Sequence, residues 1–160
     1  MKYRTKLWYN DFRKAHCSSS RDDALIAHTE KAYLAYLEEY KKTFPCPPFF
    51  METVDNLHDC DILFTKWSGD DFVVRTDHFL SSEDEFIELT FKNANIKKKD
   101  FDKQDVGWCY SELYPAKKGY ELHVLIFEFG TSEMYDLIIE CEDIKISNGR
   151  LYSPTVDGTV

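Results

Sequence analysis

The chain has 160 residues, 43% hydrophobic and 16% aromatic, a composition that excludes a disordered chain and favours a single domain, residues 1–160, with a buried core. Its formal net charge is −9: residues 1–42 carry nine Lys/Arg against six Asp/Glu, and residues 43–160 carry eleven against twenty-three. The acidic part argues against nucleic-acid binding. The chain has no apolar run of roughly 20 residues, so we expect no membrane contact. No apolar segment follows the basic N-terminus, so we expect no signal peptide and hence a cytoplasmic protein.

Two N-terminal helices are predicted, which together make residues 1–44 a helical cover. The first spans about residues 6–16, because Thr5 can cap it and its apolar residues fall on one face. That face consists of Trp8, Phe12 and Ala15. The second begins after a run of serines with acidic residues at its start, and it stops at Pro45. The apolar stripe expected to cover a sheet consists of Ile26, Tyr33, Leu37, Tyr40 and Phe44.

The rest of the chain is typical of short strands. A proline-rich connector over residues 45–60 leads into a predicted sheet over residues 61–146. Residues 97–100 are interpreted as a charged loop, and residues 147–160 as a flexible tail. The predicted strands are 61–67, 71–77, 85–92, 108–114, 120–128 and 135–146. We therefore expect an α+β fold in which two N-terminal helices pack on one face of a mostly antiparallel, meandering sheet of about six strands.

The last three strands have a pattern that predicts their register. Turns near Lys117 and between Thr131 and Ser132 pair Val124 with Tyr110 on one side and Ile139 on the other. The face that the helices should bury then consists of Trp108, Tyr110, Leu122, Val124, Ile126, Leu137, Ile139 and Cys141.

The opposite face is mixed and is the candidate binding surface. It has an apolar island, which either a loop or a partner should cover. The island consists of Leu125, Phe127 and Ile138, and the polar residues beside it are Glu121, His123 and Glu140.

Two groups of residues could carry chemistry. Ser111, His123 and Glu140 lie side by side on adjacent strands in the predicted register, and they are the residue types that acyl transfer needs. We prefer to interpret them as a solvated polar row, because no strained elbow or oxyanion hole accompanies them. His58, Asp59 and Asp61 could bind a metal or act as acid and base. The alternative is structural: Asp59 bonds local amides at a strand entry while His58 packs.

Aromatic residues and cysteines give no cofactor site. Trp108, Tyr110, Tyr114 and Tyr120 form a predicted cross-strand cluster, read as core rather than as a platform for a base or sugar. Five cysteines without a Cys-x-x-Cys motif indicate reduced thiols rather than disulfides or zinc. We expect no cofactor and no metal.

Three short blocks, Thr5–Tyr9, Leu57–Ile62 and Gly119–Leu125, resemble a set of bacterial proteins of Bacillus and Clostridium type that is classed only as a domain of unknown function. The chain is shorter between the first two blocks, where the family has a longer helical insert. The resemblance implies no established activity and no catalytic residue. It implies that His58, Asp59, Glu112 and His123 recur, for a reason that could be structural. The structural motif that we expect consists of Trp8, His58, Asp59, Trp108 and Glu112.

The size, acidity and layout also resemble immunity proteins that neutralise bacterial toxins, although a shared layout is a weak argument for function. Our main hypothesis is a non-enzymatic binding protein, of immunity or regulatory type. It would use the acidic sheet surface against a basic protein, or associate with itself. The alternative is a small hydrolase or metal-dependent enzyme that uses His58, Asp59 and Asp61, or His123 and Glu140.

Overall fold

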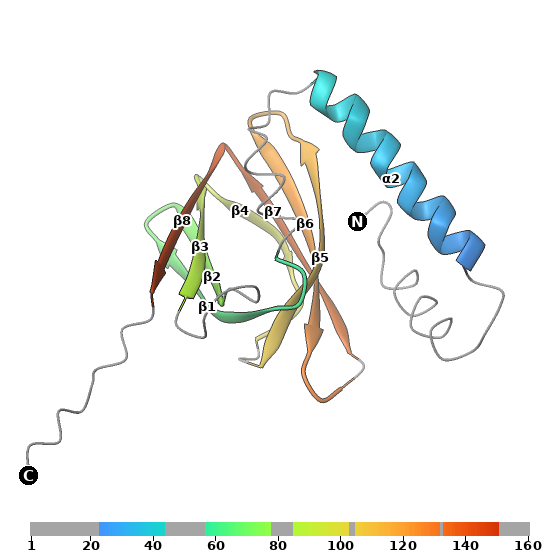
Figure 1. The fold of residues 1–160 in the computed structure, drawn as a ribbon. Coiled ribbons are helices and arrows are strands. Elements are labelled where there is room, and N and C mark those ends of the chain that lie inside the picture. Colours follow the sequence, from blue (N-terminus) through green and yellow to red (C-terminus); the bar gives the residue numbers. More distant parts are fainter. Residues whose placement is uncertain (1–22, 44–56, 78–84, 103–104, 132, 151–160) are drawn as a thin grey trace, which may run out of the picture.

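The computed structural model describes residues 23–43, 57–77, 85–102, 105–131 and 133–150 (Figure 1). Within this part of the chain, one helix precedes eight strands, so the fold is mostly β with a short N-terminal helix. The elements are α2 (Asp23–Thr43), β1 (Cys60–Ser68), β2 (Asp71–Asp77), β3 (Glu85–Lys92), β4 (Asn95–Lys99), β5 (Val106–Pro115), β6 (Tyr120–Glu128), β7 (Met134–Cys141) and β8 (Asp143–Arg150).

The second predicted helix is confirmed as α2, whereas the first, with Trp8, lies outside the described residues. Three strand predictions need correction. The charged loop predicted at 97–100 overlaps β4, which ends at Lys99, and the single strand predicted at 135–146 is broken at Glu142 into β7 and β8. β8 also continues to Arg150, into the segment predicted as a tail. Residues 151–160 lie outside the described part.

All strand pairs are antiparallel, in the order β4-β7-β6-β5-β1-β2-β3-β8. β3 leads directly into β4, and β7 leads directly into β8. These two stretches pair along their whole length, from Glu85 with Arg150 to Lys99 with Leu137. One bent two-stranded ribbon therefore joins the two ends of the strand order. The sheet consequently curls back on itself, which Figure 1 shows as two groups of strands facing each other.

The core lies inside this curl. Val124 and Ile139 are fully buried, as the sequence predicts, and Val74 and Leu89 belong to the same apolar cluster. Their cover differs from the prediction, because β1–β3 and β8 face these side chains, whereas α2, the one N-terminal helix in the described residues, adds Tyr33 to the cluster. The sheet supplies both layers of its own core, since alternate residues of each strand point inward.

The helix α2 lies instead beside β5 (Figure 1). β5 pairs with β1 only through Gly107 and Trp108, so most of its outer edge has no strand partner among the described residues. Tyr33 donates a hydrogen bond to the Ser111 carbonyl at 3.3 Å, and Tyr36 donates one to the Leu113 carbonyl at 2.9 Å. The helix therefore covers a strand edge that would otherwise expose backbone acceptors.

A β-bulge in β5 changes the predicted faces. Trp108 pairs with Ile126 as predicted, but the register shifts before Tyr110, which pairs with Leu125 instead of Val124. Ser111 therefore lies opposite Val124 and is buried, whereas Tyr110 moves to the outer face. The β6–β7 register is shifted by two residues from the prediction, so Val124 pairs with Leu137. A shift by two preserves the faces, whereas a bulge of one residue exchanges them.

Candidate functional site

The predicted apolar island is mostly not accessible. Leu125 is fully buried, and Phe127 and Ile138 are half-buried. Leu125 is therefore removed from the candidate binding surface. Phe127 remains on it, because its ring meets the Phe129 ring edge-on at 4.7 Å and Phe129 is 42% exposed.

The outer face of β5 and β6 carries a polar network beneath α2. His123 Nε2 lies 2.7 Å from Glu121 Oε1, and its ring meets the Tyr114 ring edge-on at 4.9 Å. The Tyr114 hydroxyl donates to Glu112, whose side chain is fully buried, and the Tyr36 ring packs on the Tyr114 ring at 5.6 Å. These contacts join strand and helix, so the network positions α2 as well as its own polar groups.

The predicted Ser111–His123–Glu140 group is not assembled. The bulge turns Ser111 to the inner face, whereas His123 pairs across the strands with Ile138 on the outer face. His123 and Glu140 also have different partners: Glu121 for the first, and Lys97, at 2.6 Å, for the second. The nucleophile and the base of this hypothesis lie on opposite sides of the sheet.

His58 and Asp59 are in contact, with His58 Nδ1 2.8 Å from Asp59 Oδ2. The His58 ring meets the Tyr110 ring edge-on at 4.4 Å, and Asp59 adopts a positive φ of 65°. The Asp59 amide donates to the Trp108 carbonyl at 2.8 Å, which anchors the entry to β1 on β5. The carboxylate that accepts a backbone amide at this entry is that of Asp77, not that of Asp59 as predicted.

Asp61 has Asp77 as its neighbour. The Asp61 amide donates to Asp77 Oδ1 at 2.6 Å, so the two carboxylates share one end of the β1–β2 hairpin. Partial burial, and next the negative charge of Asp77, raise the pKa of Asp61. No salt bridge in the described part of the chain includes either carboxylate.

Other carboxylates on the sheet have cationic partners. Glu88 binds Arg75 at 2.6 Å, Asp136 binds Lys98 at 2.7 Å, and Asp71 binds Lys92. Lys118 lies 3.9 Å from Glu142. Neighbouring cations therefore compensate much of the formal negative charge of the sheet. The Asp61–Asp77 pair differs from these carboxylates, because it has no such salt bridge in the described part of the chain.

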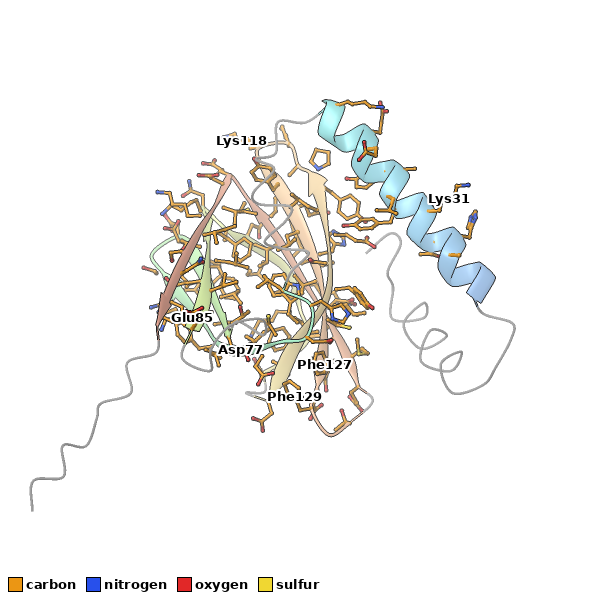
Figure 2. The ribbon with its side chains drawn as sticks, in the orientation of Figure 1. Lys31, Asp77, Glu85, Lys118, Phe127 and Phe129 are labelled. Atoms are coloured by element: carbon orange, nitrogen blue, oxygen red, sulfur yellow. The ribbon has the colours of Figure 1, made fainter. Side chains whose placement is uncertain are left out.

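The Asp61–Asp77 pair lies next to Phe127, which is half-buried, and Phe129, which is exposed. Asp61 pairs with Gly107 on β5, and Gly107 pairs with Phe127 on β6, so these positions share the outer face. Gly107 lacks a side chain, and a β-carbon there would overlap the Phe127 ring. We call Asp61, Asp77, Phe127 and Phe129 the acidic–aromatic row; Figure 2 shows Asp77, Phe127 and Phe129 at the same end of the sheet.

The sequence predicted two members of this row, Asp61 and Phe127, and missed the other two. The signal for Asp77 is the hairpin itself, because strands over residues 61–67 and 71–77 with a turn at Gly69 place Asp77 opposite Asp61. Phe129 follows the predicted end of β6. The signal for Phe129 is Gly107, because glycine within a strand often marks a close approach, and a β-carbon at Gly107 would meet the rings of Phe127 and Phe129.

Of the predicted aromatic cluster, Trp108 is fully buried in the core, whereas Tyr110 and Tyr114 lie on the outer face. The thiols of Cys60, Cys109 and Cys141 are buried and are not in disulfides. Among the described residues, no group of three or more His, Cys, Asp or Glu side chains could hold a metal ion. Within the same residues, no helix has the length and apolar character needed to cross a membrane.

Comparison of the chain with protein-family models, curated proteins and solved structures finds no match. The likeness of three short blocks to an uncharacterised bacterial family therefore stays an expectation from the sequence.

Proposed function

We propose that the chain is a non-enzymatic protein-binding module that holds a basic partner protein on the outer face of its sheet. The acidic–aromatic row is the contact surface in this proposal. Binding of this kind fits an immunity or regulatory role, in which a cationic protein is held or neutralised. The observation that carries the proposal is the Asp61–Asp77 pair, because its two carboxylates lie together and no cationic side chain among the described residues compensates them.

Two neighbouring carboxylates repel each other, and the cost is retained in the free protein. A lysine or arginine of a partner would relieve this repulsion and so gain more than it would at a compensated carboxylate. The aromatic half of the row supports the same chemistry. Cations bind favourably to the faces of aromatic rings within about 6 Å, and Phe129 is 42% exposed.

The test is affinity capture with wild-type protein and with the double variant Asp61→Asn/Asp77→Asn. We expect the wild type to retain a protein with a basic surface at about 0.05 M salt and to lose it at about 0.5 M, because salt screens exposed charges. The double variant should lose it at both salt concentrations. The matched control is Glu140→Gln/Glu142→Gln, which removes the same charge from carboxylates that have cationic partners.

Identical capture by the wild type and the double variant would refute the proposal, as would equal loss in the control. A partner that survives high salt unchanged would also contradict it, because its binding would not depend on charge. Identification of the captured protein by mass spectrometry gives its isoelectric point, which we expect to lie well above 7.

A further inference from the structure

Among the described residues, the second half of β1 has no strand partner on the side away from β2. β1 pairs with β5 only through Cys60 and Asp61, whereas its pairing with β2 continues to Ser68. No described group accepts from or donates to its backbone on the side away from β2. Two of the four exposed large apolar side chains in the described residues, Leu63 (41%) and Trp67 (54%), lie on this segment. An edge with both free backbone groups and exposed apolar side chains is a site for another strand.

The turn after β1 determines which backbone groups are free. Gly69 and Asp70 form a two-residue loop with a φ of 64° at Gly69, so Ser68 and Asp71 are a hydrogen-bonded pair. Hydrogen-bonded and non-hydrogen-bonded pairs alternate along an antiparallel ladder. The amide and carbonyl groups of Thr65 and Trp67 therefore point away from β2, toward the free edge.

The free segment is self-complementary about Thr65. In an antiparallel pairing of two copies centred on this residue, Thr65 exchanges both of its hydrogen bonds with Thr65 of the partner subunit. Leu63 then faces Trp67 of the partner subunit, and Phe64 faces Lys66 of the partner subunit. The second pairing matches charge to ring, and Lys66 already lies 5.2 Å from the Phe64 ring of its own chain. Lys66 is the one charged residue between Ile62 and Gly69, so this segment has no carboxylate although the chain as a whole is acidic.

A hollow borders Leu63, the residue that faces Trp67 of the partner subunit in this pairing. It has a volume of about 170 Å³ and is lined by Ile62, Leu63, Phe64, Thr65, Lys99, Phe101 and Asp102. A cavity of roughly 150 Å³ is large enough for a benzene ring, so this one is of the size of an aromatic side chain. Trp67, which is 54% exposed, is a projecting group on the same segment.

We propose that two copies of the chain join through their β1 edges, with Trp67 of each copy seated in the hollow beside Leu63 of the other. The interface is two-fold symmetric and extends the sheet from one subunit to the next. It is small, so we expect a dissociation constant on the order of 100 µM. It uses neither Asp61 nor Asp77, so it is independent of the binding function proposed above.

Sedimentation velocity over a protein concentration range of about 10 µM to about 1 mM tests the inference. The wild type should pass from monomer to dimer within this range, and more readily at high salt, because salt screens the repulsion between two chains of charge −9. Binding of a basic partner should instead weaken at high salt, so the two proposals have opposite salt dependence.

Two variants address the edge and the tryptophan separately. Thr65→Pro removes an amide that faces the free edge but leaves the β1–β2 ladder intact, and Trp67→Ala empties the hollow. Each should weaken the dimer at least tenfold. Leu34→Ala is the control, because Leu34 is equally exposed, at 57%, but lies on α2.

If Thr65→Pro does not fold, Trp67→Ala decides alone, since its side chain is half exposed in the monomer. A wild type that stays monomeric throughout the range overturns the inference and leaves the β1 edge open to a strand of another protein. A dimer that Trp67→Ala does not weaken, or that Leu34→Ala weakens equally, also overturns it.

Discussion

Phe127 lies across Gly107, so that a β-carbon at position 107 would occupy the space of the Phe127 ring. Gly107→Ala must displace this ring, and we expect the free energy of unfolding to fall by about 1–3 kcal/mol. Urea denaturation measures the change. The double variant Gly107→Ala/Phe127→Leu is the control, because a smaller side chain at position 127 should recover part of the loss. If alanine at 107 costs nothing, the ring is not held over this glycine.

The tyrosines of α2 offer a second prediction. Tyr33 and Tyr36 donate to the carbonyls of Ser111 and Leu113, and Tyr33 is fully buried. Tyr33→Phe should lower the free energy of unfolding by about 1–3 kcal/mol, because it removes a hydrogen bond to a buried backbone carbonyl, and Tyr36→Phe should cost less. Hydrogen exchange should show faster exchange of β5 amides in both variants. An unchanged β5 would mean that α2 does not protect this edge.

Asp61 should make the protein less stable at neutral pH than at acidic pH. Its folded pKa is raised, by burial first and by Asp77 second, so its contribution to stability is fully present below 3.8 and is lost as the pH rises through the folded pKa. Asp61→Asn removes the ionised form, so we expect a higher melting temperature than wild type at pH 7 and no difference at about pH 3. A variant less stable at pH 7 would contradict the repulsion between Asp61 and Asp77.

Asp71 should behave in the opposite way and serves as the comparison. A hydrogen bond from Lys92, and next one from the Asn93 amide, lower its pKa. A lowered folded pKa gives stability that is present above 3.8 and is lost as the pH falls through the folded value. Asp71→Asn should therefore lower the melting temperature at pH 7, and the difference should vanish at strongly acidic pH. The two carboxylates thus give melting-temperature changes of opposite sign.

Cys141 should be unreactive in the folded protein. Burial, followed by the charges of Asp143 and Glu140, raises the pKa of its thiol to about 12, so the nucleophilic thiolate is nearly absent at pH 8. In a chain with Cys17→Ser and Cys46→Ser, we expect a thiol reagent to label Cys60, Cys109 and Cys141 only as the protein unfolds. The labelling rate with and without urea is the measurement. Rapid labelling without urea would contradict the burial of these thiols.

The sequence predicts the inner face of β6 and β7 correctly because burial on one side leaves an alternating pattern. Leu122, Val124 and Ile126 alternate with Glu121 and His123 and are buried as predicted. The bulge before Tyr110 leaves no such signal, because β5 is apolar on both faces around Trp108. An extra residue in an unbroken apolar run changes no pattern, yet it exchanges the faces beyond it.

The acidic–aromatic row could be predicted only in part for a related reason. Lys97–Lys99 belong to β4, a short strand at one end of the strand order. Lysine is common on such strands, but a run of lysines is equally typical of a loop, so the sequence does not distinguish the two. Because β4 is not predicted as a strand, the sequence does not show that a two-stranded ribbon joins the two ends of the strand order. The meeting of Asp61 with Asp77 is a local feature of the β1–β2 hairpin, in which Ile62 pairs with Thr76. The meeting of Asp61 with Gly107 depends on the short β1–β5 pairing, a tertiary feature with no local signal.

The bent ribbon of β3–β4 and β7–β8 has a consequence for how the chain folds. Each half of the sheet contains one piece of each ribbon strand, so neither half can be completed until residues 85–99 have met residues 134–150. Such pairing between distant segments closes a long loop before it gains stability, which slows folding relative to helical proteins of the same length. We therefore expect the two halves to melt as one cooperative unit.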